Sequence, residues 1–215
     1  MGTLYFLGGE NISKRDAKEI NQLSFEDAGS SPTILVFTWA RPSFDAHFKR
    51  RQRLINYFRS LGASSVNFSE FSDSIKDISL KAQQSDLIYL TGGQVGTLLN
   101  RLRTTGVDKL LQKYKGEIVG RSAGALVLGK SCVVTNRYSG HQKKVPCLRL
   151  VDFCVRTHYE PSKDFSLRCQ SKKEKIYTIS NCSALVYDNG VLSSVGEVFL
   201  FENGKKTPFT GPLAY

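Results

Sequence analysis

The stretch KGEIVGRSAGALVLG, residues 115–129, decides how the fold of this chain is interpreted. A short strand-like run leads into Gly-Arg-Ser-Ala-Gly at residues 120–124, and small, apolar, helix-forming residues follow. Two glycines around a serine let the backbone turn sharply from strand to helix and leave the hydroxyl exposed. The pattern predicts a nucleophile elbow in which Ser122 attacks and the backbone N–H of Ala123 stabilises an oxyanion. A tight turn of purely structural purpose is the alternative.

Length and composition bound the class of protein. The chain has 215 residues, of which 40% are hydrophobic and 11% aromatic, and this is enough to bury a full core. We therefore expect a single domain over residues 1–215. No apolar run approaches the roughly 18 residues of a membrane span, and the N-terminus lacks the basic region of a signal peptide. A cytoplasmic protein without a membrane partner is expected.

The cysteines argue against a metal centre. There are five of them, an odd number, and no two form a CxxC pair. Without a secretory signal such residues are typical of buried or partly buried free thiols. The sequence implies neither a metal nor a cofactor.

The charge admits two interpretations. Thirty basic and 19 acidic residues give a net charge of +11, with clusters at FKRRQR (48–53), at residues 143–144 and at KKEK (172–175). Such an excess suits nucleic acid, an anionic surface or an acidic substrate. The apolar residues of 48–62 fall near helical spacing, however, which favours a helix whose charged face is simply solvated.

The first two thirds of the chain alternate between strands and helices. Near-continuous apolar strands separated by helices predict an α/β fold, a doubly wound and mostly parallel sheet with helices on both faces. The expected strands are 3–9, 33–40, 64–71, 86–93 and 117–121, and the expected helices include 13–28, the segment after Pro42, 74–84 and 95–114.

The alternation of strands and helices ends after residue 129. Short strands follow, with Asn-Gly turns at residues 189–190 and 203–204, and this pattern predicts a β-rich C-terminal part. We expect both hairpins at the edge or end of the sheet.

A nucleophilic serine needs a base, and the chain has three histidines. His47 lies in the basic segment and His141 in a polar loop, so neither has local support for catalysis. His158 ends the strand-like run LVDFCVRTHY (150–159), which would bring it to a strand end as well. His158 is the predicted general base.

At this point the motifs FLGG, IYLTGGQ, VGRSAGA, THY and SALVYDNG, in this order and spacing, resemble a known family. They are similar to those of the serine peptidases that include aspartyl dipeptidase (dipeptidase E) and cyanophycinase, and the likeness covers nearly the whole chain. The resemblance implies the fold of class I glutamine amidotransferases. It also implies Ser122 as nucleophile, His158 as base, and Gly92, Gly93 and Ala123 around the oxyanion.

The sequence departs from that pattern where relatives often carry a carboxylate. Asn181 stands in one of these places, immediately before a strand-like run. An amide oxygen can orient a histidine, so we predict that Asn181 accepts a hydrogen bond from His158. Glu160 and Asp152 are the other candidates. Arg121, before the nucleophile, is larger and more charged than the family leads one to expect.

Two further readings stay open. An α/β-hydrolase would use the order Ser122, Asp152, His158, but 36 positions between serine and histidine leave little room for the strands that fold places there. A relative that lost catalysis and binds nucleic acid or another anion is the second reading. The combination of serine, histidine and Gly-Gly loop favours the enzyme over it.

The sequence thus predicts a dipeptidase E-like hydrolase acting on short peptides. If the positive charge serves an acidic substrate, Arg121 and Arg156 are the candidate cations, the alternative being that each faces solvent or packs structurally. Nucleic acid is not the expected partner, and a homodimer is left open.

Overall fold

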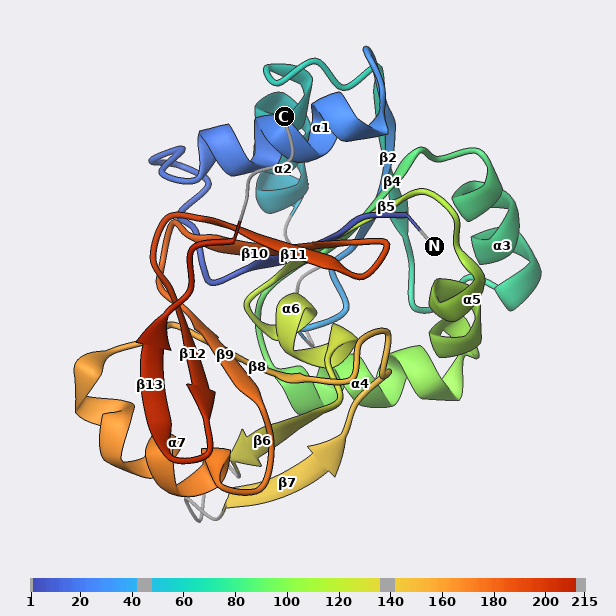
Figure 1. Cartoon of the computed structure of the whole chain (residues 1–215). Coiled ribbons are helices and arrows are strands. Elements are labelled where there is room, and N and C mark those ends of the chain that lie inside the picture. Colours follow the sequence, from blue (N-terminus) through green and yellow to red (C-terminus); the bar gives the residue numbers. More distant parts are fainter. Residues whose placement is uncertain (1, 42–47, 136–141, 212–215) are drawn as a thin grey trace.

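A computed structural model describes residues 2–41, 48–135 and 142–211 of the chain. Its architecture is mixed α/β, with a central sheet, a smaller second sheet and a two-stranded ribbon (Figure 1). The predicted fold class, including the β-rich C-terminal part, is confirmed. His47 and His141 lie outside the described residues.

The central sheet has seven strands in the order β11-β10-β1-β5-β4-β2-β3. Five of them are parallel, because β1 pairs with β5, β5 with β4, β4 with β2 and β2 with β3 in that sense. Their bounds are β1 Leu4–Leu7, β2 Thr33–Phe37, β3 Ser65–Ser69, β4 Leu87–Leu90 and β5 Glu117–Arg121. Strands β1 and β4 are entirely apolar and fully buried, β2 is apolar after Thr33, and the three central residues of β5 are buried between Glu117 and Arg121, as interior parallel strands require.

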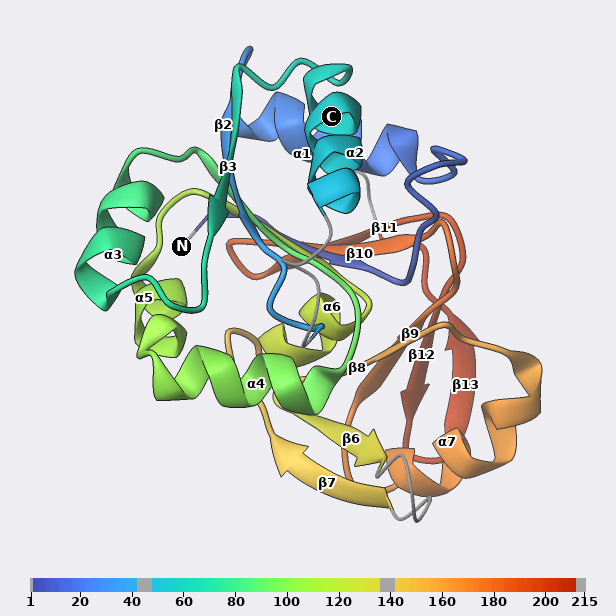
Figure 2. The ribbon, with the colours of Figure 1, turned by 180° about the vertical axis from the view of Figure 1, so that it is seen from behind.

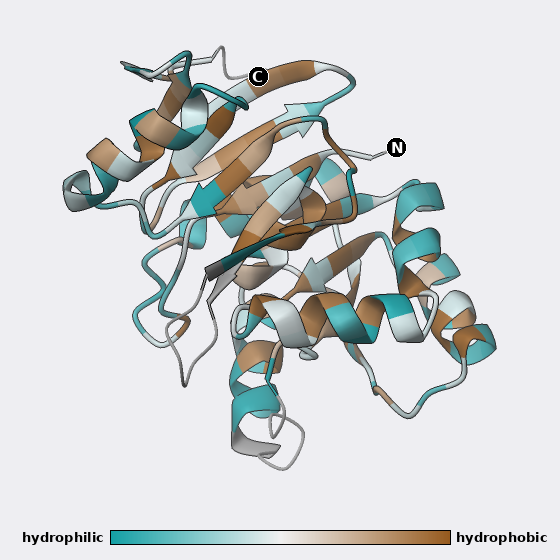
Figure 3. Cartoon of the chain, turned by 90° about the horizontal axis from the view of Figure 1, so that it is seen from below, coloured by the Kyte–Doolittle hydropathy of each residue, from teal (hydrophilic) through white to brown (hydrophobic). Residues whose placement is uncertain are grey.

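Helices cover both faces of this sheet (Figures 1 and 2). Alternate side chains of β1 point to opposite faces, with Tyr5 in one core cluster and Phe6 in the other. The cluster around Tyr5 includes residues of α1 Lys18–Ala28 and α2 Phe48–Arg59. The cluster around Phe6 includes residues of α3 Ile75–Gln83, α4 Val95–Thr104, α5 Val107–Lys113 and α6 Ala123–Leu128. In Figure 3 the interior strands are largely brown, whereas the helices carry both colours along their length.

The helix expected over 95–114 is broken into α4 and α5. Gly106, between them, has a φ of +79°, which only glycine adopts without strain, so the chain turns there instead of continuing the helix.

Both Asn-Gly turns form hairpins. Asn189 and Gly190 have φ values of +45° and +94°, and Asn203 and Gly204 of +52° and +76°, as a tight two-residue turn requires. The first turn joins β10 Ala184–Asp188 to β11 Val191–Val195, which extend the central sheet at its β1 edge.

The second hairpin corrects the expectation that both hairpins join that sheet. It joins β12 Val198–Glu202 to β13 Lys205–Pro208 and belongs to a separate four-stranded sheet, β13-β12-β9-β8. The other members are β8 Cys154–Thr157 and β9 Ile176–Ile179, with η2 Pro161–Lys163 and α7 Asp164–Ser171 between them. The ribbon consists of β6 Ser131–Thr135 and β7 Gln142–Pro146. The strand that ends before His158 therefore lies in a different sheet from the strand that ends before Ser122.

Candidate active site

The turn between β5 and α6 carries Ser122. Its backbone has a φ of +51° and a ψ of −107°, a conformation that a residue with a side chain adopts at a cost. The flanking glycines are required by space, because a Cβ on Gly120 would lie 2.6 Å from the backbone of Gly124, and one on Gly124 would lie 2.2 Å from the carbonyl oxygen of Leu90. The glycines of the quoted stretch thus permit close packing of the turn against strand β4.

His158 and Asn181 lie in line with this serine. Ser122 Oγ is 2.7 Å from His158 Nε2, and His158 Nδ1 is 2.6 Å from Asn181 Oδ1. An amide oxygen only accepts hydrogen bonds, so Nδ1 carries the ring proton and Nε2 is free to accept from the serine hydroxyl. The structure thus brings together the three residues that the sequence singled out, although they come from two sheets and a loop.

The loop after β1 makes room for the histidine and the asparagine. A Cβ on Gly9 would lie 2.5 Å from both Asn181 Oδ1 and His158 Cε1, so only glycine fits there. The amide of Cys182 donates to the carbonyl of Gly9 (2.8 Å), which ties this loop to the one that carries Asn181. Sequence reasoning gave Gly9 no role of its own; the signal was the second glycine of FLGG at a strand end.

The two other candidates for the residue that orients His158, Asp152 and Glu160, lie elsewhere. Asp152 pairs with Lys130 (3.1 Å) and Arg149 (3.0 Å), and Glu160 lies 3.7 Å from Lys163. Both carboxylates are exposed, and neither hydrogen-bonds His158. The described geometry leaves Asn181 as the partner of the imidazole.

Gly92 and Gly93 follow β4 and lie beside the serine. A Cβ on Gly92 would be 3.2 Å from the Cβ of Ser122, and Gly93 has a φ of +152°. Among the described residues, no hydrogen-bond acceptor is seen for the backbone N–H of Gly93 or Ala123. These two amides are therefore open to a ligand next to the serine hydroxyl.

A cavity of about 540 Å³ contains the Ser122–His158 pair. Arg156 and Lys163 lie in its wall, and no carboxylate does within the described part of the chain. The guanidinium of Arg156 donates to Gln170 Oε1 (3.2 Å) and to the carbonyl of Val155 (3.1 Å), whereas the ammonium of Lys163 donates to the carbonyl of His158 (2.8 Å). The cavity next to the serine is thus positively charged.

The comparison with known families agrees with this arrangement: residues 9–195 match peptidase family S51. The chain belongs to peptidase family S51. It is therefore a serine-type peptidase, as the motifs predicted.

Curated relatives of this S51 peptidase carry peptidase names. It is 32% identical over 139 residues to an uncharacterized peptidase of Listeria monocytogenes, which covers 59% of this chain and 68% of the relative. It is 31% identical over 113 residues to an uncharacterized peptidase of Pasteurella multocida, which covers 48% of this chain and 54% of the relative.

Solved structures share the fold. A peptidase from an acI-B1 actinobacterium superposes with a TM-score of 0.78 at 21% identity, over 99% of this chain and 96% of the other. A putative peptidase E protein from Listeria monocytogenes gives 0.70 at 23% identity, over 91% and 98% of the two chains.

Arg121 of the S51 peptidase does not line the cavity of the serine. Its guanidinium lies 3.5 Å from the fully buried carboxylate of Glu10. Burial raises the pKa of Glu10, against the lowering effects of Arg121 and of hydrogen bonds from Tyr89 and Asn21. Of the two cations expected to meet the substrate, Arg156 is in the wall of the serine cavity and Arg121 is in the wall of a second one. Sequence reasoning missed Glu10 because nothing local marks it.

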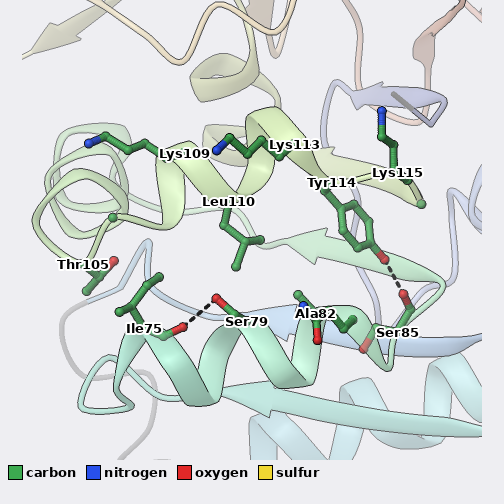
Figure 4. A pocket seen from close by; sticks show the side chains of 13 residues that line it. Ile75, Ser79, Ala82, Ser85, Thr105, Lys109, Leu110, Lys113, Tyr114 and Lys115 are labelled. Atoms are coloured by element: carbon green, nitrogen blue, oxygen red, sulfur yellow. Dashed lines mark hydrogen bonds between the residues drawn. The ribbon is translucent and has the colours of Figure 1, made fainter.

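A larger cavity, of about 720 Å³, lies between α3 and α5 (Figure 4). Leu110 of α5 points toward Ile75 of α3, and the hydroxyl of Tyr114 donates to the carbonyl of Ser85 (2.6 Å) at one end. No histidine lines it among the described residues. The hydroxyls of Ser79 and Ser85 in its described lining donate to backbone carbonyls, so neither serine is paired with a base.

No helix in the described ranges combines the length and the apolar character that crossing a membrane demands.

Proposed function

We propose that this S51 peptidase hydrolyses short peptides through an acyl-enzyme on Ser122, as a dipeptidase E-like enzyme. The observation that carries the proposal is the continuous line from Ser122 Oγ through His158 to Asn181 Oδ1, with contacts of 2.7 and 2.6 Å. A serine, a base within hydrogen-bond reach and a third group that orients the base form the set that nucleophilic catalysis requires.

Acylation uses the free ring nitrogen. As the oxygen of Ser122 bonds to the carbonyl carbon of the substrate, its proton passes to Nε2 of His158. The carbonyl π electrons move to the oxygen, and the carbon becomes tetrahedral. Asn181 holds the ring in the required tautomer but, being neutral, adds little to the stability of the imidazolium.

The developing oxyanion needs hydrogen-bond donors at the same edge. The Gly-Gly loop abuts the serine, and the amides of Gly93 and Ala123 are open, so we assign the oxyanion hole to them with Gly92 as the close-packed neighbour. Collapse of the tetrahedral species re-forms the carbonyl and breaks the C–N bond, and the imidazolium protonates the departing amine. Water then attacks the ester and gives a proton to His158. As the second tetrahedral species breaks its bond to the oxygen of Ser122, the imidazolium returns that proton to the serine and the acid product leaves.

Acidic peptides fit the charge of the cavity. Arg156 and Lys163 are in its wall and no described carboxylate lines it, although Lys163 also lies 3.7 Å from the exposed Glu160. A carboxylate on the substrate would therefore enter a positive field and find charge-assisted donors.

The test is hydrolysis of a dipeptide and isoaspartyl-dipeptide library by the wild type and by Ser122→Ala. The wild type should cleave peptides with N-terminal Asp, and Ser122→Ala should lose at least about three orders of magnitude in kcat, as when a triad member is removed. A serine-directed phosphonate should label Ser122 and no other residue.

A matched control is Ser79→Ala. In the wild type the hydroxyl of Ser79 donates to the carbonyl of Ile75 (2.7 Å) in the cavity between α3 and α5. This variant should keep wild-type rates and phosphonate labelling. Activity of Ser122→Ala within tenfold of the wild type would overturn the proposal.

A further inference from the structure

A second cavity beside the active site is built around arginines. It has a volume of about 270 Å³, and Arg41, Arg50, Arg53 and Arg121 line it together with Ile12 and Leu54. Arg50 and Arg53 are three residues apart on α2, so they share one face of that helix. Arg41 follows β2, and Arg121 is the last residue of β5. Helix α2, the loop after β2 and the end of β5 thus bring four arginines to the wall of one cavity.

Only one of these four arginines has an anionic partner among the described residues. Within the described ranges, Arg41, Arg50 and Arg53 pair with no carboxylate, and Arg121 shares the buried Glu10 at 3.5 Å. Burial lowers the pKa of Arg41, and the neighbouring charges of Arg50 and Arg121 lower it further. Like charges held close together repel each other, and a bound anion would relieve that repulsion.

The position of Arg41 is held by other contacts. The guanidinium of Arg101 donates to the carbonyls of Trp39 (3.0 Å) and Arg41 (3.3 Å), and the amide of Gln94 donates to the carbonyl of Ala40 (2.7 Å). The backbone that carries Arg41 is therefore anchored to α4, by Gln94 just before that helix and by Arg101 in its last turn.

The number of charges selects the chemistry of the ligand. Four arginines line the pocket and one of them pairs with a carboxylate, so a single additional carboxylate would still leave two positive charges unbalanced. A phosphoryl group carries a charge of about −1.5 to −2 and three acceptor oxygens, which match several planar forks at once. We infer that this four-arginine pocket is a binding site for a phosphoryl group, separate from the cavity in which the peptide bond is cut.

The pocket and the catalytic serine share a wall. A Cβ on Gly93 would lie 2.9 Å from Cγ of Arg41, and one on Gly92 would lie 3.6 Å from Nε of Arg121 and 3.2 Å from the Cβ of Ser122. The Gly92–Gly93 loop thus lies between the arginines and the active site. A phosphoryl group in the pocket would sit next to the loop that we assign to the oxyanion hole.

The test is calorimetric titration of the full chain with inorganic phosphate, with sodium chloride added to hold ionic strength constant. Binding should saturate with a Kd below about 1 mM, and the double variant Arg50→Gln/Arg53→Gln should bind at least about tenfold more weakly. Both side chains are exposed, so the variant should fold normally. The control is Arg59→Gln, which removes the same charge from the last turn of α2, outside the pocket, and should leave the Kd unchanged.

Phosphate binding that does not saturate, or that the double variant leaves unchanged, overturns the proposal. Acetate binding as tightly as phosphate overturns the choice of a phosphoryl group. A phosphoserine dipeptide titrated into Ser122→Ala identifies the source: tighter binding than inorganic phosphate assigns the group to a peptide, and equal or weaker binding assigns it to a free phosphate. The readout is binding, so its failure is independent of the failure of the proposed hydrolysis.

Discussion

The two cavities beside β4 and β5 differ in which ends of the strands they meet. The serine cavity lies at the carboxyl ends, where Gly93 follows β4 and Ser122 follows β5. The α3–α5 cavity lies at the amino ends, where Ser85 precedes β4 and Gly116 precedes β5, and it is the larger at about 720 Å³ against 540 Å³. In open α/β sheets ligands bind outside the carboxyl ends of the strands. Volume alone therefore does not identify the site.

The backbone φ angles of the same two regions also differ. Around the serine, three residues with side chains have positive φ: Ser122 (+51°), His158 (+53°) and Cys182 (+56°), next to Asn181. In the α3–α5 cavity the positive φ belongs to Gly106 (+79°), which adopts it freely. Strained residues persist only where the surroundings hold them, and they cluster at functional sites. Residues with side chains therefore adopt positive φ around the serine, whereas in the α3–α5 cavity the positive φ belongs to a glycine.

The largest effect should come from adding a methyl group to a glycine of each region. Gly9→Ala would press against His158 and Asn181 and should lower kcat about 100-fold, since a displacement of about 1 Å in a catalytic group costs that much. In Gly106→Ala the new Cβ would lie 4.0 Å from Ile75, so only the positive φ is penalised, by about 1 kcal/mol of stability. Steady-state kinetics and thermal unfolding of both variants measure the difference. Equal losses of activity in both would remove the contrast between the regions.

A smaller effect should follow from changing Asn181. Asn181→Ala should lower kcat about tenfold, because the ring of His158 loses its orienting acceptor while the base itself remains. Asn181→Asp should raise kcat above the wild type, since a carboxylate also stabilises the imidazolium. Kinetics of the three proteins at one pH, with circular dichroism to verify folding, make the comparison. An Asp variant slower than the wild type would show that the amide does more than orient the ring.

The smallest effect concerns the charge of the serine cavity. Arg156→Gln should reduce kcat/KM about fivefold for a dipeptide with N-terminal Asp, since it removes one charge-assisted donor. The rate for the Ala analogue should change by less than about twofold, and added salt should shrink the preference for Asp. Arg168→Gln, on α7 and outside the described cavity lining, is the matched control and should leave both rates unaltered. A preference for Asp that survives Arg156→Gln would assign substrate recognition to another cation.

Much of this protein follows from local sequence. The run into Gly120-Arg121-Ser122 predicts a strand and a sharp turn, because glycine removes the steric limits on the backbone there. The turns at 189–190 and 203–204 predict hairpins for the same reason, since asparagine and glycine tolerate positive φ. The strand-end position of His158 also follows from the strand-like run before it, because β8 ends one residue earlier, at Thr157.

Other features depend on partners distant in the chain. Only the folded structure assigns the strand before His158 to a second sheet, chooses Asn181 over Glu160 for the contact with the imidazole, and turns Arg121 toward Glu10. These outcomes result from packing and pairing between segments up to about a hundred residues apart, which no window of sequence encodes. Local sequence determined which residues are suited to catalysis, because backbone freedom and side-chain chemistry are local. Tertiary structure decided which of these residues meet, because burial and strand pairing depend on residues far apart in the chain.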